Sequence, residues 1–408
     1  MTADTAGCNG QTPAAGGPLD ASRLTYQFTK VPRAIPAPNS PELWAQSEAT
    51  DHMILARYDV AKGGWLAPQL VPYGPLSLAP TAATLHYAME CFEGLKLYRG
   101  VDGRLRLFRP DLNAKRMQKS AARVSLPDFP PEQLVLLIDA LAAIDAPRWL
   151  PKDSVGTYLY VRPTMIATQP SLAIKKASEA LLYILLVCFP DFDQPSGSLG
   201  PPPGDAENKP KKDLGLRLVA SNKETIRAWP GGFGNCKLGA NYGPSIVASA
   251  EAARRGFDQI LWLFGNEEFI TEAGACNFFT VIQPKHSGSA QLLTAPLEDG
   301  VVLPGVTRAS VLDIVNELFA NELEVVERNF SIHELIDAVN NARMVECFVC
   351  GTAFFITPVA EINYKGQSIN VLPSKKAPCS LVARLRARLW KIMYGEIQHR
   401  WSHCVDET

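Results

Sequence analysis

Apolar residues in the first half of the chain recur with two periods, one typical of strands and one typical of helices. Short alternating or continuous apolar runs predict strands at residues 52–58, 104–108, 158–163 and 180–189. Helical spacing predicts two helices, at residues 112–123 and 132–144. The run at 180–189 is apolar throughout, so we expect it to be buried on both faces. Mixed α and β structure is therefore predicted.

The second half repeats this mixture. Its apolar runs predict strands at residues 214–221, 259–264 and 275–282. Its helical spacing predicts helices at residues 244–255, from about 305 onward, and at about 381–394. The first of these helices has Pro244 in its first turn and Gly256 just past its end, which is the usual placement of both residues. The apolar stripe of that helix is expected to face a sheet and consists of Ile246, Val247, Ala250 and Ala253.

Local composition divides the 408 residues into segments. Residues 1–40 are rich in Ala, Gly, Thr and Pro and lack apolar periodicity, which predicts a mobile N-terminal arm. Residues 194–213, QPSGSLGPPPGDAENKPKKD, combine Pro, Gly and charge, which is typical of an exposed interdomain loop. We therefore expect a small α/β domain at 41–193 and a large domain at 214–408.

Charge and cysteine usage narrow the classes of function. The chain has 40 Lys+Arg and 41 Asp+Glu, a net charge of -1, so it lacks the basic excess expected of a nucleic-acid-binding protein. Its 9 cysteines are scattered, which favours a reducing compartment over a secreted disulfide framework. The longest apolar stretch, 180–190, is about half of the roughly 20 residues that cross a bilayer, so no membrane span is predicted. A cytoplasmic protein is expected, with mitochondrial import left open.

One lysine stands in an unusual setting, within WPGGFGNCKLGANYGP (229–244). Lys237 lies among glycines and apolar residues with no carboxylate beside it in the sequence. Such a setting disfavours the charged amine, which makes it available as a nucleophile or base. Tyr242, five residues on, could donate a hydrogen bond near that amine. An ordinary lysine on a turn and a packed tyrosine are the alternatives that this window leaves open.

Three further positions are candidates for binding an ionic group. Glu272 lies in an apolar stretch, where a carboxylate needs a partner such as a protonated ring nitrogen. Val306 and Thr307 open a predicted helix, whose free amides attract phosphate. Arg116 could add a bidentate phosphate contact. A solvated glutamate, an ordinary helix end and a surface arginine are the corresponding alternatives.

Tyr160 and Arg162 lie two apart on a predicted strand, so both side chains project from one face. An arginine on such a face pairs either with a carboxylate of the protein or with one on a ligand, and the sequence leaves both open. The pair His399 and His403 lacks a second pair of ligands, so no metal site is predicted. Cys347-Phe-Val-Cys350 has redox spacing but lies in an apolar, strand-like run. The sequence contains no Walker lysine, GxSxG elbow or Rossmann glycine fingerprint.

Taken in order, these windows resemble the branched-chain amino acid aminotransferases in their eukaryotic form, which are pyridoxal-phosphate enzymes of fold type IV. The resemblance spans some 350 residues, from TDHM (50–53) to YGEIQHRW (394–401). It includes the blocks LHYAMECFEG (85–94), RLFRP (106–110), LYVRP (159–163), GNCKLG (234–239), LPGV (303–306) and GTA (351–353). It implies two domains, a smaller N-terminal α/β domain and a larger C-terminal domain with a barrel-like sheet.

The resemblance implies a role for each matching residue. Lys237 would form the Schiff base with pyridoxal 5'-phosphate and move the proton between the substrate α-carbon and the cofactor. Tyr242 would bond the phenolic oxygen, and Glu272 would keep the pyridine nitrogen protonated. The phosphate would be bound by Arg116, Val306, Thr307 and Thr352. Thr352 and Ala353 belong to the turn that would offer backbone amides to the substrate α-carboxylate.

The same resemblance implies substrates and partners. The reaction would be reversible ping-pong transfer of the amino group of L-leucine, L-isoleucine or L-valine to 2-oxoglutarate. Apolar walls for the branched side chain would be formed by Tyr87, Phe92, Tyr160 and Phe192. Arg162 would pair with the γ-carboxylate of glutamate. In a homodimer, the neighbouring subunit would contribute Tyr87, Leu172 and Ile174.

The chain departs from the family pattern at several places. Where animal members carry a redox Cys-x-x-Cys after Gly-Thr-Ala, this chain has Phe-Phe-Ile-Thr at 354–357, so we expect that thiol switch to be absent. Ala45 replaces a usual aromatic pocket residue and Ala275 a usual phosphate-side threonine. Three alternatives are kept: a D-amino acid aminotransferase, an aminodeoxychorismate lyase, and a catalytically silent binding member.

Overall fold

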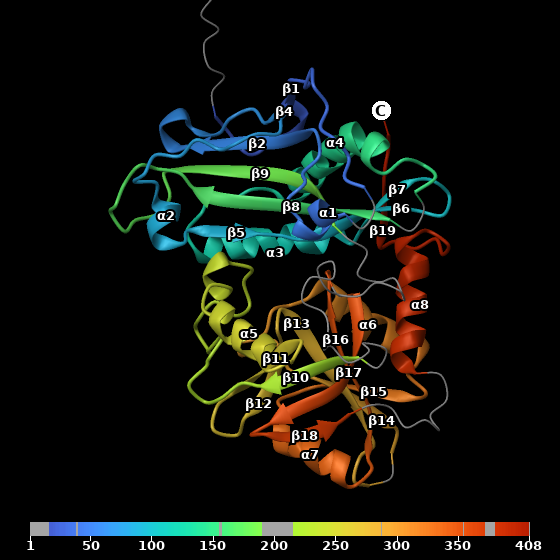
Figure 1. Ribbon diagram of the computed structural model, residues 1–408. Helices are drawn as coiled ribbons and strands as arrows, with labels where there is room; N and C mark the ends of the chain where they lie inside the picture. The colour runs from blue at the N-terminus through green and yellow to red at the C-terminus, as the bar shows by residue number, and fades with distance from the viewer. Residues whose placement is uncertain are drawn as a thin grey trace, which may run out of the picture.

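The computed structural model describes residues 16–37, 40–154, 157–189, 215–286, 288–353, 355–371 and 380–407. These residues form two sheets, which lie one above the other in Figure 1. Helix α3 (Pro110–Arg123) runs along the side of the upper sheet that faces the lower one. Helices α5 (Ser245–Arg254) and α8 (Leu381–Met393) lie on opposite flanks of the lower part. The predicted mixture of α and β structure is confirmed.

The upper sheet has the strand order β1-β4-β2-β9-β8-β6-β7-β19, with β3 paired to β2 and β5 to β8. Its strands are β1 (Thr25–Tyr26), β2 (His52–Asp59), β3 (Gly64–Trp65), β4 (Gln69–Pro72), β5 (Glu90–Phe92), β6 (Leu95–Arg99), β7 (Leu105–Phe108), β8 (Tyr158–Ala167), β9 (Glu179–Cys188) and β19 (Ser402–Val405). Helix α4 (Pro131–Trp149) and α3 pack their apolar side chains into the core of this sheet.

The lower sheet closes on itself. Its order is β12-β11-β10-β17-β16-β13-β14-β15, with β18 paired to β17, and β12 also pairs with β13. Its strands are β10 (Leu216–Ala220), β11 (Gln259–Phe264), β12 (Phe269–Ala273), β13 (Cys276–Ile282), β14 (Ala290–Thr294), β15 (Leu323–Glu327), β16 (Met344–Gly351), β17 (Phe355–Tyr364) and β18 (Gln367–Asn370). The ring from β12 to β13 is the barrel-like sheet that the resemblance predicts.

The remaining helices are short or cover the barrel. Helix α6 (Val306–Leu318) begins after Gly305, as the sequence predicts, and buries most of its apolar residues against β15 and β16. The others are α1 (Pro41–Ala45), α2 (Ala83–Tyr87), α7 (Ile332–Asn340) and the 3-10 turns η1 (Ala21–Arg23), η2 (Val60–Lys62) and η4 (Gly239–Asn241). Among the described helices, none is long and apolar enough to span a membrane.

Two expectations about buried faces are wrong. In α5, Ile246 and Val247 are exposed, while Ala248 and Ala252 pack on β10 and β11. Small residues allow the closest approach of a helix to a sheet. The alanines therefore face the sheet, and the larger residues of the predicted stripe face away from it. Strand β9 is not buried on both faces, because buried and half-buried residues alternate along much of its length.

The ends of the chain join the upper sheet. Leu19, within the expected arm, is 1% exposed, and β1 pairs with β4. Strand β19 returns from the lower part and pairs antiparallel with β7. Residues on both sides of the expected interdomain loop therefore complete one sheet. The loop itself, 194–213, lies outside the described residues.

Candidate active site

A cavity of about 280 Å³ lies where the two sheets meet. Residues of β5 and β8 from the upper sheet line it, together with residues of β13, β16 and the start of α6 from the lower part. Eleven of the predicted site residues line this one cavity: Phe92, Arg116, Tyr160, Arg162, Lys237, Tyr242, Glu272, Val306, Thr307, Thr352 and Ala353. These residues come from widely separated segments, so only the fold brings them together.

The amine of Lys237 lies beside a phenol. Its Nζ donates to the hydroxyl of Tyr242 over 3.0 Å and lies 4.9 Å from the centre of the Phe92 ring. Lys237 forms no ion pair with any described residue, although its charge acts to lower the pKa of both Glu93 and Glu272. The expectation of an amine without a bonded carboxylate is therefore met for the described part of the chain, but two buried carboxylates lie within range of its charge.

The backbone around Lys237 is held by two elements of the upper part, α3 and β5. Its N–H donates to the hydroxyl of Ser120 on α3 over 2.8 Å, and its carbonyl accepts from the N–H of Phe92 on β5 over 3.1 Å. Ser120 is completely buried. The upper sheet and its helix therefore hold the lysine segment in place, and no local pattern marks Ser120 for this role.

Arg116 is held by a buried carboxylate that sequence reasoning missed. Its Nε and Nη2 donate to the two oxygens of Glu93 over 2.7 and 2.8 Å, and its Nη1 donates to the carbonyl of Pro304 over 3.0 Å. Asn113 also donates to Glu93 over 2.8 Å. Burial raises the pKa of Glu93, but Arg116, together with Lys237 and Asn113, holds that pKa below its usual value.

Arg116 has more N–H groups than its protein partners use. A guanidinium carries five N–H groups, and three of them serve Glu93 and Pro304. Arg116 lines the cavity together with Val306 and Thr307, and the Pro304 carbonyl that it bonds lies two residues before the start of α6. This corner of the cavity can bind an anion.

Glu272 lines the same cavity and is almost fully buried. It is paired with Arg227, which sequence reasoning also missed, and its Oε1 accepts from Asn277 over 3.2 Å. Burial raises the pKa of Glu272, against the lowering effects of Arg227, the N–H of Leu303 and the charge of Lys237. A carboxylate in this setting can accept a proton or a hydrogen bond from a basic ring nitrogen.

Gly305 allows the loop before α6 to approach Asn277, which is a partner of Glu272. A Cβ at this position would lie 2.1 Å from Oδ1 of Asn277, whose amide donates to the carbonyl of Leu303 over 2.9 Å. A larger residue at 305 would displace Asn277, and with it one partner of Glu272. The LPGV block therefore positions both the anion corner and the carboxylate wall.

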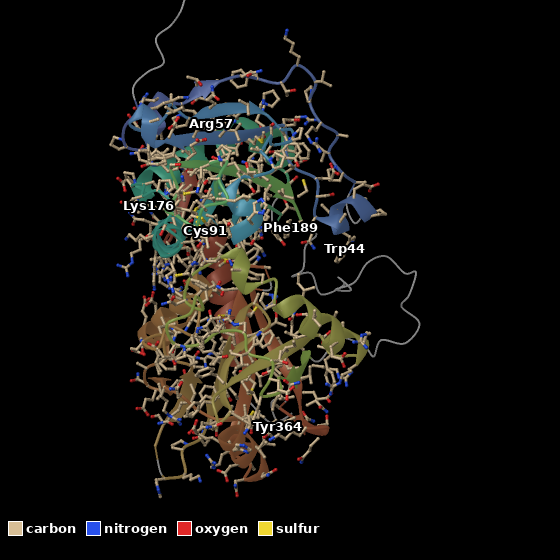
Figure 2. All side chains as sticks on the ribbon, turned by 90° about the vertical axis from the view of Figure 1, so that its left-hand side faces the viewer. Trp44, Arg57, Cys91, Lys176, Phe189 and Tyr364 are labelled. Atoms are coloured by element: carbon tan, nitrogen blue, oxygen red, sulfur yellow. The ribbon has the colours of Figure 1, made fainter. Side chains whose placement is uncertain are left out.

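The upper wall combines apolar rings with an arginine. Tyr160 stacks on Phe189 with ring centres 4.4 Å apart, and Figure 2 shows Phe189 on the side of the upper sheet that faces the lower part. The guanidinium of Arg162 lies 4.8 Å from the centre of the Phe92 ring. Its buried Nε has no partner, and it forms no ion pair among the described residues. Phe189 was predicted only as the end of a strand.

Four predicted residues do not line the cavity of this single chain. Tyr87, Leu172 and Ile174 are 37%, 55% and 88% exposed, and the hydroxyl of Tyr87 donates to the carbonyl of Leu172. Phe192 lies outside the described residues. Two alanines depart from the family pattern: Ala45 is exposed on α1, and Ala275 lines the cavity.

The competing constellations lack the geometry for chemistry. Cys347 and Cys350 are fully buried in different hydrophobic clusters, on opposite faces of β16, and burial raises the pKa of Cys347 to about 12. Such a pair cannot form a disulfide without rearrangement. His403 pairs with Asp139 over 2.8 Å. In the described part of the chain, no cluster of His, Cys, Asp or Glu could hold a metal ion.

Comparison with known proteins decides the family. The profile of the family Amino-transferase class IV matches residues 90–362, which include every residue lining the cavity. The chain belongs to this family. The resemblance predicted from the sequence is confirmed, and so is the fold type.

Several relatives of this class IV aminotransferase carry more specific names. The cytosolic branched-chain-amino-acid aminotransferase of Saccharomyces cerevisiae is 41% identical, over 96% of this chain and 98% of that protein. The cytosolic enzyme of Mus musculus with the same name is 42% identical, over 86% of this chain and 85% of its own. The mitochondrial enzyme of Rattus norvegicus is 39% identical, over 93% and 91%.

Solved structures agree with the fold of this class IV aminotransferase. The branched-chain aminotransferase of Thermoproteus uzoniensis with norvaline has a TM-score of 0.64 at 22% identity, over 87% of this chain and 99% of that chain. The enzyme of Thermobaculum terrenum in its PLP form has a TM-score of 0.64 at 20% identity, over 88% and 99%. At these identities the agreement bears on the fold alone.

Proposed function

We propose that the protein is a branched-chain amino acid aminotransferase that moves the amino group of L-leucine, L-isoleucine or L-valine to 2-oxoglutarate. The observation that carries this proposal is the position of the Lys237 amine, 3.0 Å from the Tyr242 hydroxyl, in a cavity with a buried carboxylate at one wall and an anion corner at another. The relatives at about 40% identity share that named activity.

The residues fit pyridoxal 5'-phosphate. The spare N–H groups of Arg116 and the first amides of α6, at Val306 and Thr307, would hold its phosphate, with Thr352 beside them. Tyr242 would donate to its phenolic oxygen, and Glu272 would bond its ring nitrogen. When bound, this cofactor supplies an aldehyde for the amine and a ring that accepts the electron pair released at the α-carbon.

The protein's own groups would perform the proton transfers. Lys237 forms no ion pair with a described residue, so its amine would serve as the base. It would take the proton from the substrate α-carbon and deliver it to the cofactor. Tyr242, at hydrogen-bond distance, would orient that amine. Glu272 would keep the ring nitrogen protonated from the buried wall.

The upper wall would distinguish the two kinds of substrate. Phe92 and Tyr160 offer apolar surface to a branched side chain, worth about 0.8 kcal/mol for each buried methylene. Arg162 would pair with the γ-carboxylate of glutamate or 2-oxoglutarate, because its buried Nε lacks a partner in the described part of the chain. The amides of the 351–353 turn would receive the α-carboxylate.

We also propose a homodimer. Tyr87, at the end of α2, and Leu172 and Ile174, in the loop between β8 and β9, expose apolar surface that would contact the cavity of a second copy. The relatives include cytosolic and mitochondrial forms, and the cytoplasm remains the compartment we propose.

The decisive experiment follows amino transfer from L-leucine to 2-oxoglutarate by product analysis, for the wild-type protein and for Lys237→Ala. The wild-type protein should produce L-glutamate and the branched 2-oxo acid, and the variant should lose both activity and the covalently attached cofactor. A fully active variant would refute the assignment. Transfer from D-amino acids only, or release of pyruvate from aminodeoxychorismate, would favour the alternative enzymes. Failure of the wild-type protein to bind the cofactor would favour a silent binding member.

A further inference from the structure

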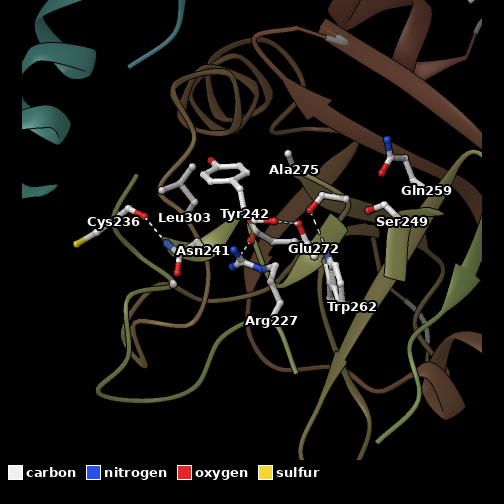
Figure 3. Close-up of a pocket in the computed structure, with 13 residues that line it drawn as sticks. Arg227, Cys236, Asn241, Tyr242, Ser249, Gln259, Trp262, Glu272, Ala275 and Leu303 are labelled. Carbon is white, nitrogen blue, oxygen red and sulfur yellow. Dashed lines mark hydrogen bonds and ion pairs between the residues drawn. The ribbon is translucent and has the colours of Figure 1, made fainter. Parts of the chain in front are cut away.

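A second cavity, of about 210 Å³, lies behind the wall formed by Glu272. Four residues line both this cavity and the one that contains Lys237: Tyr242, Glu272, Ala275 and Leu303. Figure 3 shows the second cavity, with Arg227 directed at Glu272 and with Ser249 and Gln259 at its far side. Glu272 is therefore accessible to polar groups from two sides.

Arg227 occupies the side of Glu272 away from Lys237. It forms an ion pair with Oε2 of Glu272, and its Nη2 also donates to the carbonyl of Val301 over 2.9 Å. The side chains of Arg227 and Glu272 are 12% and 4% exposed, so water screens this pair only weakly. The carbonyl of Val301 fixes the guanidinium, which in turn fixes the carboxylate.

The other groups that contact Glu272 directly are neutral, and the cations Lys237 and Arg308 act on it only from a distance. Asn277 donates from its side-chain amide over 3.2 Å, and Leu303 donates from its backbone N–H. Burial acts to protonate Glu272, and Arg227 provides the strongest opposition to it. Without the guanidinium, the carboxyl group would have no cation in direct contact among the described residues.

We propose that Arg227 is a positioning residue that keeps Glu272 ionised and thereby decides where the proton between Glu272 and the cofactor ring nitrogen resides. This inference rests on the proposed function. The guanidinium touches the carboxylate directly and reaches the ring only through it, so its main effect is to make the carboxylate the weaker base of the two. The proton then stays on the nitrogen, as the chemistry requires.

The second cavity offers room for water beside the ion pair of Arg227 and Glu272. The side chains of Ser249 and Gln259 make no hydrogen bond to a described residue, so they leave polar atoms facing the cavity. Water in a polar space of this size can solvate the outer edge of the Arg227 guanidinium. A neutral side chain at 227 would leave Glu272 with this water as its only new partner.

The test measures the protonation of the ring nitrogen by ¹⁵N NMR, with pyridoxal 5'-phosphate labelled at that nitrogen and bound to the full-length protein. The wild-type protein should show a protonated nitrogen across the neutral pH range. Arg227→Gln should lose this proton at a pH lower by at least about one unit, which corresponds to a tenfold change in the protonation constant. Its affinity for the cofactor should also fall by about tenfold.

Three further variants make the result decisive. Arg227→Lys keeps the positive charge but lacks the planar guanidinium. The ring nitrogen should therefore hold its proton more strongly in this variant than in Arg227→Gln. The lysine variant also provides the test if the glutamine variant does not fold. Glu272→Gln should lose the proton outright. Arg254→Gln removes an exposed arginine of α5 whose one ion pair among the described residues is with Glu251, and it should match the wild type. An unchanged nitrogen signal in both Arg227 variants would overturn the inference, whereas a wild-type protein that binds no cofactor would overturn the proposed function.

Discussion

Glu93 and Arg116 form a two-point ion pair that is closed to solvent, with N···O distances of 2.7 and 2.8 Å. The carboxylate is completely buried, and it also accepts from Asn113 and from the N–H of Gly94. Arg116 therefore reaches the anion corner of the cavity with its orientation already set. A lysine could not replace it, because an ammonium group has no fork with which to bond both carboxylate oxygens.

This pair predicts strong coupling in a double-mutant cycle. Glu93→Leu should destabilise the cofactor-free protein by about 3–5 kcal/mol, because it leaves a guanidinium buried without its counter-charge. Combining it with Arg116→Met should recover about 1–3 kcal/mol of that loss, since the second change removes the unpaired charge. Urea unfolding of the four proteins measures both values. The more exposed two-point pair of Arg384 and Glu322 is the matched control and should show a coupling of at most about 1 kcal/mol. Additive losses at 93 and 116 would contradict the prediction.

The sequence predicted those parts of the site that depend on local pattern. Lys237, Tyr242 and the helix start at Val306 each stand in a window whose glycines, prolines and apolar residues define the setting. Glu93 and Arg227 could not be found in this way, because their roles depend on partners in other segments. A carboxylate in the apolar CFEG block was the available signal for Glu93, since burial there demands a cation.

The prediction of the fold was also limited to features that depend on local sequence. The five longest of the described helices were predicted, and so were strands with long apolar runs such as β2, β8, β9 and β13, since hydrophobic period is a local property. Many short strands and the buried face of α5 were not predicted. Which face of that helix meets the sheet is decided by the space above β10 and β11, where Ala248 and Ala252 fit against Trp262. Likewise, no local pattern shows that β19 returns to the upper sheet, because its partner β7 is almost three hundred residues away in sequence.

Arg162 predicts a change of specificity rather than a general loss. Arg162→Leu should lower kcat/KM for L-glutamate by about 10- to 100-fold, the usual worth of a hydrogen-bonded charge pair, and should change that for L-leucine by less than about threefold. Steady-state kinetics with each amino donor separates the two values. Arg162→Lys is the control for charge and should retain part of the glutamate activity. Equal losses for both donors would reject the proposed pairing with the γ-carboxylate.

A shared active site predicts complementation between two inactive variants. The first carries Lys237→Ala, and the second carries Tyr87→Ala, Leu172→Ala and Ile174→Ala together. If each cavity takes the three exposed residues from the other subunit, a mixed dimer has one complete site and one doubly defective site. Co-expression at equal levels should then restore about one quarter of the wild-type sites, the statistical yield for a twofold dimer. If the three residues act within their own chain, the mixture should stay as inactive as its parents.

His403 and Asp139 connect the C-terminal strand β19 to α4, and they predict a pH-dependent contribution to stability. The hydrogen bond to Asp139 raises the pKa of His403 above its ordinary value of 6.5, with smaller contributions from Asp111 and Asp406 and an opposing one from burial. A raised pKa in the folded state means that the stabilisation is complete below pH 6.5 and is lost as the pH rises through the folded value. Since His403 is 39% exposed, its size is at most about 1 kcal/mol.

Asp139→Asn should therefore lower the melting temperature at about pH 5.5 and have little effect at about pH 9, where the imidazole is neutral in both proteins. Thermal unfolding at the two values, with His403→Asn as a second variant and the exposed Asp153→Asn as the control, tests the sign. A loss that is larger at the alkaline value would contradict the assignment, because only a lowered histidine pKa gives that order. Equal losses at both values would assign the pair a packing role without a charge component.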